Sequence, residues 1–173
     1  MARHIFLTGE KRVGKSTLLQ KVLAQYTGKV GGFFTVRTDA FLPDAHSVHL
    51  FCADDKPVPG ASNLLFVCGV PDPHTPERFD HLGCRALAKC ENCSLIVMDE
   101  LGPHEANAAL FHQTVLKRLD GDIPILGVLQ APAALFWPDI TGHPEVKILE
   151  ISEANREQED IIESIFSVIL NRQ

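Results

Sequence analysis

The sequence contains no long hydrophobic run. Its apolar stretches have the length of short strands, whereas a membrane-spanning helix needs about 20 apolar residues in succession. The apolar run that follows His4 is also too short for the hydrophobic region of a secretory signal, and no cleavage site follows it. We therefore expect a cytoplasmic protein with no membrane partner.

A surplus of basic residues is also missing. Lys and Arg number 16 against 22 Asp and Glu, which gives a net charge of −6, whereas proteins that bind nucleic acid usually carry a basic face. The basic residues are scattered, apart from a small cluster at Lys11, Arg12 and Lys15. Nucleic acid is therefore not expected as the main partner.

The cysteines lack the pattern of a disulfide framework. Their number is odd and no secretory signal precedes them, which indicates reduced thiols in the cytoplasm. Part of the set has the order His81-x-x-Cys84-x₅-Cys90-x-x-Cys93, which could instead form a structural zinc site. The spacing from Cys84 to Cys90 is shorter than usual between pairs of zinc ligands, so zinc is the less favoured alternative. The five cysteines are Cys52, Cys68, Cys84, Cys90 and Cys93.

The organisation of the chain indicates one domain over residues 1–173. No internal repeat, low-complexity tract or linker divides it, and 45% hydrophobic and 22% charged residues are ordinary for a globular protein. A chain of 173 residues can bury a proper core without disulfides or metal.

The most informative motif is a phosphate-binding loop of the form G-x-x-x-x-G-K-S over residues 9–16. A short apolar run over 4–8 predicts a buried strand before it. The apolar side chains after it fall on one face of a helix. In this arrangement backbone N–H groups and the helix dipole hold phosphates, Lys15 reaches the β- and γ-phosphates as a catalytic group, and the Ser16 hydroxyl ligates Mg²⁺. The predicted nucleotide-binding residues are Gly9, Glu10, Lys11, Arg12, Val13, Gly14, Lys15, Ser16 and Thr17.

A second motif places an acidic pair at the end of a buried strand. The apolar run over 95–98 is followed by Asp99 and Glu100, and the carboxyl edge of an open α/β sheet is where ligands bind. We expect Asp99 to hold Mg²⁺ through its water shell. Glu100 is then the catalytic residue that orients or deprotonates the water attacking the γ-phosphate.

Three further residues are candidates for contacts to the γ-phosphate. Gln130 follows a predicted strand and could touch the γ-phosphate or the water, although a solvated glutamine is an equal alternative. Arg37 also follows a strand and Arg12 lies within the loop. Either cation could stabilise charge on the transferred group. The alternatives are a surface salt bridge for Arg37 and a solvated charge for Arg12.

The remaining pattern predicts an α/β domain of three layers, a P-loop fold with a mostly parallel central sheet and an antiparallel hairpin. A short connection joins the predicted strands 31–37 and 47–52, which favours the hairpin. Helices are expected over 79–89 and 106–119, and a terminal helix is expected to follow a capping box formed by Asn155 and Gln158. Further strands are expected over 63–68, 123–129 and 146–151.

The order of these segments resembles a known family. The loop near the N-terminus, the segment 32–37 (Gly-Phe-Phe-Thr-Val-Arg) and the segment 98–102 (Met-Asp-Glu-Leu-Gly) resemble the cancer-related nucleoside-triphosphatase family of small P-loop enzymes. Segments 124–127, 143–146 and 151–156 extend the likeness. The resemblance implies a RecA-like P-loop fold, Mg²⁺ dependence, and slow hydrolysis of several nucleoside triphosphates to the diphosphate and phosphate.

Two positions depart from the pattern of that family. Arg12 stands where the loop commonly carries a further glycine, and Pro103 stands where a lysine often follows the Asp-Glu-x-Gly turn. The resemblance therefore implies binding of a nucleoside triphosphate more strongly than it implies a particular rate of hydrolysis.

The leading interpretation is an Mg²⁺-dependent nucleoside triphosphate phosphohydrolase. A nucleotide or small-molecule kinase is an alternative, but a kinase usually has an arginine-bearing lid and residues 130–142 contain no arginine. A nucleotide-binding regulatory or assembly module with little turnover is a third interpretation. No Asn-Lys-x-Asp guanine signature occurs, which disfavours a conventional GTPase switch.

Overall fold

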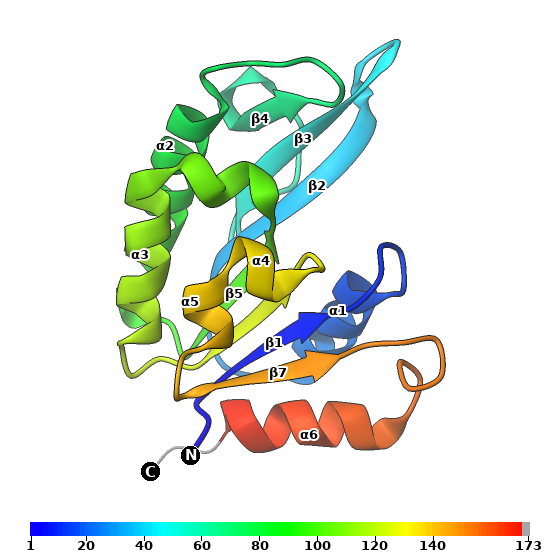
Figure 1. Cartoon of the computed structure of the whole chain (residues 1–173), viewed down its shortest axis with the longest axis vertical. Helices are drawn as coiled ribbons and strands as arrows, with labels where there is room; N and C mark the ends of the chain where they lie inside the picture. The colour runs from blue at the N-terminus through cyan, green and yellow to red at the C-terminus, as the bar shows by residue number, and fades with distance from the viewer. Residues whose placement is uncertain (171–173) are drawn as a thin grey trace.

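The computed structural model of the chain describes residues 1–170, apart from the side chain of Ala106. One sheet of seven strands, in the order β4-β3-β2-β5-β6-β1-β7, runs through the molecule (Figure 1). Strands β1, β2, β5, β6 and β7 are parallel, while β3 and β4 add antiparallel pairs beside β2. The strands are β1 (His4–Thr8), β2 (Val30–Leu42), β3 (Ala45–Cys52), β4 (Leu64–Val67), β5 (Leu95–Leu101), β6 (Ile125–Leu129) and β7 (Val146–Glu150).

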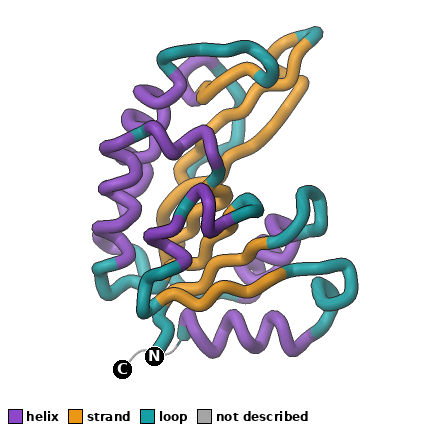
Figure 2. The backbone as a smooth tube through the Cα atoms, in the orientation of Figure 1, coloured by secondary structure: helices purple, strands orange, loops and turns teal. Residues whose placement is uncertain are grey.

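Helices cover both faces of this sheet (Figures 1 and 2). One apolar cluster lies between the sheet and α2, α3 and α5, and a second lies between the sheet and α1 and α6. The α-helices are α1 (Lys15–Gln25), α2 (Thr75–Ala88), α3 (Ala109–Leu119), α4 (Ala133–Phe136), α5 (Pro138–Thr141) and α6 (Glu159–Ile169). Short 3₁₀ turns are η1 (Ala61–Asn63), η2 (Lys89–Asn92) and η3 (Pro103–Asn107). The predicted three layers and mostly parallel sheet are confirmed.

The central strand β5 explains why both faces are apolar. Successive side chains of a strand point to opposite faces. Accordingly, Ile96 and Met98 join the cluster under α2 and α3, whereas Leu95 and Val97 join the cluster under α1. A strand covered on both faces has to be apolar throughout, which is why the run over 95–98 could be recognised.

The antiparallel hairpin is confirmed and is longer than predicted. Strands β2 and β3 pair from Phe33 with Cys52 to Leu42 with Ala45. Gly32 adjoins β5 with φ +101°, and a Cβ there would lie 2.0 Å from the Val97 carbonyl oxygen. A side chain at this position would therefore separate β2 from the strand that carries Asp99 and Glu100.

Three local predictions were wrong. Helix α2 begins at Thr75 rather than Phe79, because Pro76 is tolerated in the first turn of a helix. The helix expected over 106–119 begins at Ala109, after the 3₁₀ turn η3. The capping box before α6 is absent because the Asn155 side chain accepts from the Ser152 N–H at 2.8 Å and donates to the Glu150 carbonyl.

Within residues 1–170, no helix has the length and apolar character needed to cross a membrane.

Candidate active site

The phosphate-binding loop connects the end of β1 to the first turn of α1. Gly9 has φ +142°, and a Cβ there would lie 2.3 Å from the Ile151 carbonyl oxygen. Gly14 has φ +106° at the N-cap of α1. Both glycines of the motif are thus required by the backbone, since L side chains rarely adopt these conformations. The loop ends at the helix N-terminus, where unpaired N–H groups and the helix dipole favour an anion.

Lys15 lies at the centre of the loop. Its side-chain ammonium donates to the carbonyl oxygens of Gly9 at 2.9 Å and Glu10 at 2.6 Å. Burial lowers the pKa of Lys15, while the nearby carboxylates of Glu100 and Asp99 oppose that shift. A cation is therefore held against the loop and beside the acidic pair.

Ser16 and Asp99 meet at the edge of the sheet. The Ser16 hydroxyl donates to Oδ1 of Asp99 at 2.9 Å. Burial raises the pKa of Asp99 to about 6, and the hydrogen bond from Ser16 opposes this. A hydroxyl and a carboxylate brought together are oxygen ligands of the kind that Mg²⁺ prefers, so these two residues fit the predicted metal site.

An irregularity in β5 directs Glu100 into the same cleft as Asp99. Asp99 pairs with Val128 and Leu101 pairs with Leu129, which leaves Glu100 as an extra residue between the two pairs. Such bulges redirect side chains next to functional sites. The backbone N–H of Glu100 donates to the Thr35 hydroxyl at 3.2 Å.

Gln130 contacts Glu100 directly. The side-chain amide of Gln130 donates to Oε1 of Glu100 at 2.5 Å, and its backbone N–H donates to the Leu101 carbonyl at 2.9 Å. Gln130 therefore lies against the proposed catalytic carboxylate, rather than free in solvent at the end of β6.

These residues line one cleft of about 920 Å³. Every predicted loop residue lines it except Glu10 and Val13, and the Val13 side chain packs in the apolar cluster under α1 and α6. The predicted residues on the cleft wall are Gly9, Lys11, Arg12, Gly14, Lys15, Ser16, Thr17, Arg37, Asp99, Glu100 and Gln130. The cleft thus brings together nearly all the site residues predicted from the sequence, both those of the two motifs and the three further candidates.

The two candidate arginines lie on the cleft wall with exposed side chains. Arg12 has φ +62°, a left-handed conformation that costs a residue with a side chain more than it costs glycine. Within residues 1–170, the Arg37 guanidinium forms neither a hydrogen bond nor an ion pair with another side chain. The salt-bridge alternative for Arg37 is therefore not supported.

Sequence reasoning missed a buried carboxyl group beside Glu100. Glu105 is 5% exposed and lines the cleft. Its Oε2 accepts from the Gly102 N–H at 2.9 Å. Burial raises the pKa of Glu105 to about 7, and the charge of Glu100 adds to the shift. The available signal was the three-residue spacing from Gly102 to Glu105, which is that of a capping box.

Other missed residues come from distant segments. Thr35 and the contacting rings of Phe66 and His104 line the cleft on the side of the antiparallel hairpin. Arg156 donates from Nη1 to the Val13 carbonyl at 3.1 Å and so supports the back of the phosphate-binding loop. No spacing rule links these positions to the two motifs.

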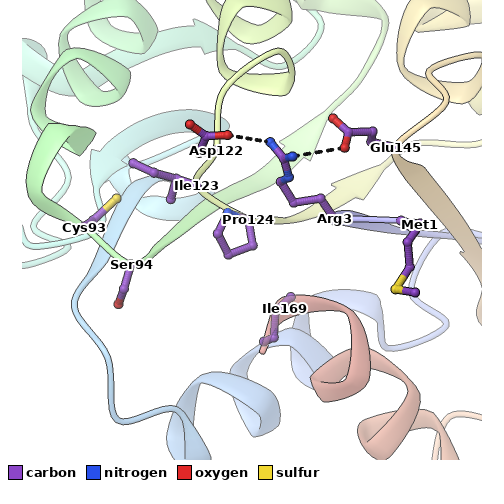
Figure 3. A pocket seen from close by; sticks show the side chains of 10 residues that line it. Met1, Arg3, Cys93, Ser94, Asp122, Ile123, Pro124, Glu145 and Ile169 are labelled. Atoms are coloured by element: carbon purple, nitrogen blue, oxygen red, sulfur yellow. Dashed lines mark hydrogen bonds and ion pairs between the residues drawn. The ribbon is translucent and has the colours of Figure 1, made fainter. Parts of the chain in front are cut away.

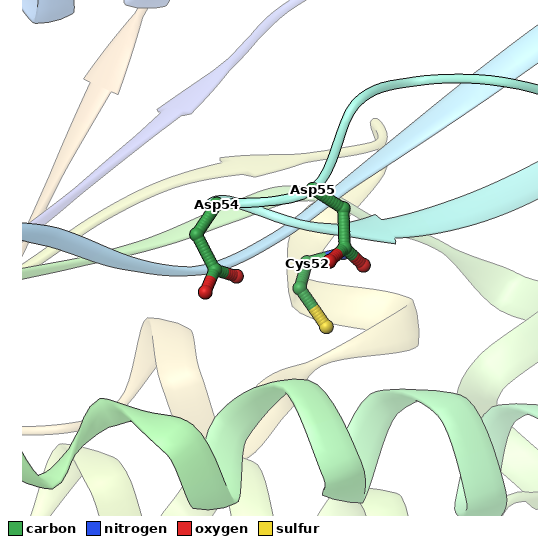
Figure 4. Close-up of side chains that lie close together, drawn as sticks. All are labelled: Cys52, Asp54 and Asp55. Carbon is green, nitrogen blue, oxygen red and sulfur yellow. The ribbon is translucent and has the colours of Figure 1, made fainter.

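The alternative of a zinc site at His81, Cys84, Cys90 and Cys93 was wrong. Among residues 1–170, the compact group of metal-ligating side chains is a different one, formed by Cys52, Asp54 and Asp55 (Figure 4). In that group Oδ2 of Asp55 accepts from the Cys52 N–H at 3.3 Å. Burial raises the pKa of the Cys52 thiol, which disfavours the thiolate that a metal would need.

Comparison with known proteins identifies the family. A family model described as NTPase matches residues 71–166, more than half of the chain. The chain belongs to this family. The nucleoside triphosphatase THEP1 of Thermotoga sp. (strain RQ2) is 26% identical to the NTPase described here over 175 residues, which cover 95% of this chain and 94% of the relative. The human cancer-related nucleoside-triphosphatase is 29% identical over 178 residues, 90% of this chain and 92% of the relative.

The fold of this NTPase is also found among solved structures. The crystal structure of THEP1 from the hyperthermophile Aquifex aeolicus matches it with a TM-score of 0.75 and 18% identity, over 98% of this chain and 99% of that one. The predicted α/β P-loop fold, the resemblance to the cancer-related family and the class of enzyme, a nucleoside triphosphatase, are thereby confirmed.

Proposed function

We propose that this NTPase binds nucleoside triphosphates with Mg²⁺ and cleaves the bond between the β- and γ-phosphates with water. The products are the diphosphate and inorganic phosphate. The observation that carries the proposal is the meeting, in one cleft, of the phosphate-binding loop, the Ser16–Asp99 pair and Glu100. Family membership supports the same chemistry.

The loop holds the phosphates. Its backbone N–H groups and the N-terminus of α1 bind the anion, and Lys15 exchanges its contacts to the Gly9 and Glu10 carbonyls for the β- and γ-phosphates. Ser16 and Asp99 hold the metal. An Mg²⁺ ion held there would neutralise negative charge that develops on the phosphates.

Glu100 orients the attacking water and accepts its proton. Gln130 fixes Oε1 of this carboxylate, which leaves the second oxygen for the water. Arg37 and Arg12, on the cleft wall with no acidic partner within residues 1–170, place positive charge beside the transferred γ-phosphoryl group. Charge complementarity of this kind stabilises the transition state of phosphoryl transfer.

The enzyme accepts several bases. Every residue assigned a role above acts on a phosphate, the metal, the water or the Glu100 carboxylate, and none of these roles involves the edge of a nucleobase. Broad base use follows from binding energy that is concentrated on the triphosphate common to all substrates.

Phosphate release tests this proposal. The purified chain is incubated with ATP, GTP, CTP or UTP, each with Mg²⁺ and with excess EDTA. Steady release that requires Mg²⁺ and occurs with several bases is expected. Release only after a second, hydroxyl-bearing substrate is added would instead identify a kinase. Binding without release would identify a regulatory module.

A further inference from the structure

Two free cysteines lie together at the end of the sheet opposite the cleft. Cys90 belongs to η2 and Cys93 is its C-cap, immediately before β5. A Cβ added to Gly31 would lie 2.9 Å from Sγ of Cys90 and 3.1 Å from Sγ of Cys93. Both thiols therefore rest against the same point of β2, where a glycine leaves room for them.

The backbone between the two cysteines forms a tight turn. The Cys93 N–H donates to the Cys90 carbonyl at 3.3 Å, and the Cys93 thiol donates to that carbonyl at 3.0 Å. A turn closed in this way brings the first and fourth Cα atoms within about 7 Å. Disulfides span Cα separations of about 4.4–6.8 Å, so the pair can be bridged with little backbone movement.

We propose that Cys90 and Cys93 form a dithiol site that low-molecular-weight disulfides oxidise reversibly to an intramolecular disulfide. The site is separate from the hydrolytic cleft and does not depend on the function proposed above. The proposal gives a role to the C-x-x-C motif, which has no part in the nucleotide chemistry.

The surroundings assign different roles to the two thiols. Cys93 is half-buried and lines a cavity of about 550 Å³ (Figure 3). Cys90, in contrast, is fully buried. A small reagent therefore reaches Cys93 first. The charged side chains that line this cavity are Arg3, Asp122 and Glu145, and Arg3 is paired with both acids at 3.0 and 3.2 Å. Met1, with the N-terminal amino group, lines the cavity as well.

The titration of the pair supports these roles. A hydrogen bond with the Cys90 thiol, distinct from the one to the Cys90 carbonyl, lowers the pKa of Cys93 to about 7, with help from the backbone N–H groups of Leu95 and Gly31 and from Arg118, while burial opposes the shift. The same bond raises the pKa of Cys90. Since the thiolate is the nucleophile, Cys93 is the attacking sulfur and Cys90 the resolving one.

The reaction consumes one small disulfide per dithiol. The Cys93 thiolate attacks one sulfur of the reagent, the reagent's S–S bond breaks, and the departing thiolate takes up a proton. Cys90 then loses its proton and attacks Sγ of Cys93, which releases the second half of the reagent as a thiol. Two protein thiols are oxidised and one disulfide is reduced to two thiols.

Oxidised glutathione is the probe for the test. The full chain is treated at neutral pH, remaining thiols are blocked with N-ethylmaleimide, and a tryptic digest is analysed by mass spectrometry. The tryptic peptide over residues 90–117 contains these two cysteines and none of the other three. We expect an internal disulfide in this peptide that dithiothreitol reverses, with Cys84→Ser as a matched control that behaves like the wild type.

Two variants separate the roles. In Cys90→Ala, which keeps an apolar group in the core, oxidation should stop at a mixed disulfide of Cys93 with glutathione. In Cys93→Ser, the rate of modification at Cys90 should fall at least tenfold. The pH at which Cys93 is half-reactive toward iodoacetamide should lie near 7 in the wild type and move toward about 8.5, the value of an ordinary thiol, in Cys90→Ala.

The proposal would be overturned by any of three results. These are complete alkylation of both thiols after oxidation, preferential modification of Cys52, Cys68 or Cys84, and an unchanged pH profile of Cys93 in Cys90→Ala. None of these outcomes bears on nucleotide hydrolysis, so failure here and failure of the hydrolytic proposal are distinguishable.

Discussion

The side-chain amide of Gln130 lies 2.5 Å from Oε1 of Glu100 and donates a hydrogen bond to it. Gln130 immediately follows β6, and Glu100 lies near the end of the neighbouring parallel strand β5, so the sheet itself sets their separation. A carboxylate fixed through one oxygen keeps the other directed into the cleft. This pairing gives Glu100 a defined orientation before substrate arrives.

Replacing Glu100 should abolish turnover and leave nucleotide binding intact. We expect Glu100→Gln, which keeps the size and the contact to Gln130 but cannot accept a proton, to lower kcat by about 10²–10⁴-fold, the usual contribution of a general base. Phosphate release measures kcat, and the quenching of a fluorescent nucleotide analogue measures binding. Retained turnover with normal affinity would show that another group activates the water.

Removing the partner of Glu100 should have a smaller effect. A hydrogen bond to a charged group contributes about 1.5–3 kcal/mol, so Gln130→Ala should lower kcat by at least about tenfold with little change in KM. Gln130→Glu should be worse, because it places a second negative charge beside Glu100. If Gln130→Ala alters KM alone, Gln130 binds substrate rather than orienting Glu100.

Arg12 has a strained backbone and a cationic side chain, and substitution can separate the effect of the first on stability from the effect of the second on substrate binding. A non-glycine residue in the left-handed conformation costs about 1 kcal/mol, so Arg12→Gly should raise the free energy of unfolding by about that amount in urea titrations. If the guanidinium also contacts the γ-phosphate, KM should rise in Arg12→Gly. Lys11→Gly is the matched control, since Lys11 lacks positive φ and its replacement should bring no gain in stability.

Fixed spacing made the two motifs predictable. Phosphates are held by backbone N–H groups, so the loop needs glycine where φ is positive, and Gly9 and Gly14 carry that requirement in the sequence itself. The buried strand β5 was equally visible, because a strand covered on both faces is apolar at every position. The fold and the positions of Lys15, Ser16 and Asp99 were therefore accessible without a structure.

Contacts between distant segments were not accessible in this way. The hydrogen bond from Gln130 to Glu100 depends on the order of strands in the sheet, and the burial of Glu105 depends on how η3 packs beside the cleft. The contact of the Cys90 and Cys93 thiols with Gly31 depends on the register between β2 and β5. Spacing along the chain does not encode these registers.

Glu105→Gln should stabilise the protein at alkaline pH. The folded-state pKa of Glu105 is raised from 4.5 to about 7 by burial, so the unfolded chain loses its proton first and stability falls as the pH rises from 4.5 to 7. Glutamine keeps an acceptor for the Gly102 N–H and never ionises. We expect a gain of up to about 3 kcal/mol at pH 8 and a much smaller one at pH 5, measured by urea unfolding.

The exposed Glu91 on η2 supplies the control, since Glu91→Gln should give no such difference between the two pH values. An equal gain at pH 5 and pH 8 in Glu105→Gln would indicate better packing rather than the removal of a buried charge.

His4 should make the protein sensitive to acid. The imidazole is fully buried in β1, and its Nδ1 accepts from the Ile125 N–H at 3.1 Å. That contact requires an unprotonated Nδ1, so Nε2 carries the hydrogen and donates to the Leu119 carbonyl at 2.9 Å. Burial accordingly lowers the pKa of His4 to about 4. As the pH falls from 6.5 to 4, His4 becomes protonated in the unfolded chain but stays neutral in the folded protein.

The free energy of unfolding should therefore decrease over this interval by up to about 3 kcal/mol. His4→Gln, which can still donate to the Leu119 carbonyl, should be less stable at pH 7 but lose this part of the pH dependence. His46→Gln, at an exposed position of β3, should retain the wild-type slope. Urea unfolding at several pH values compares the three proteins, and a His4→Gln curve parallel to the wild type would assign the acid sensitivity to other groups.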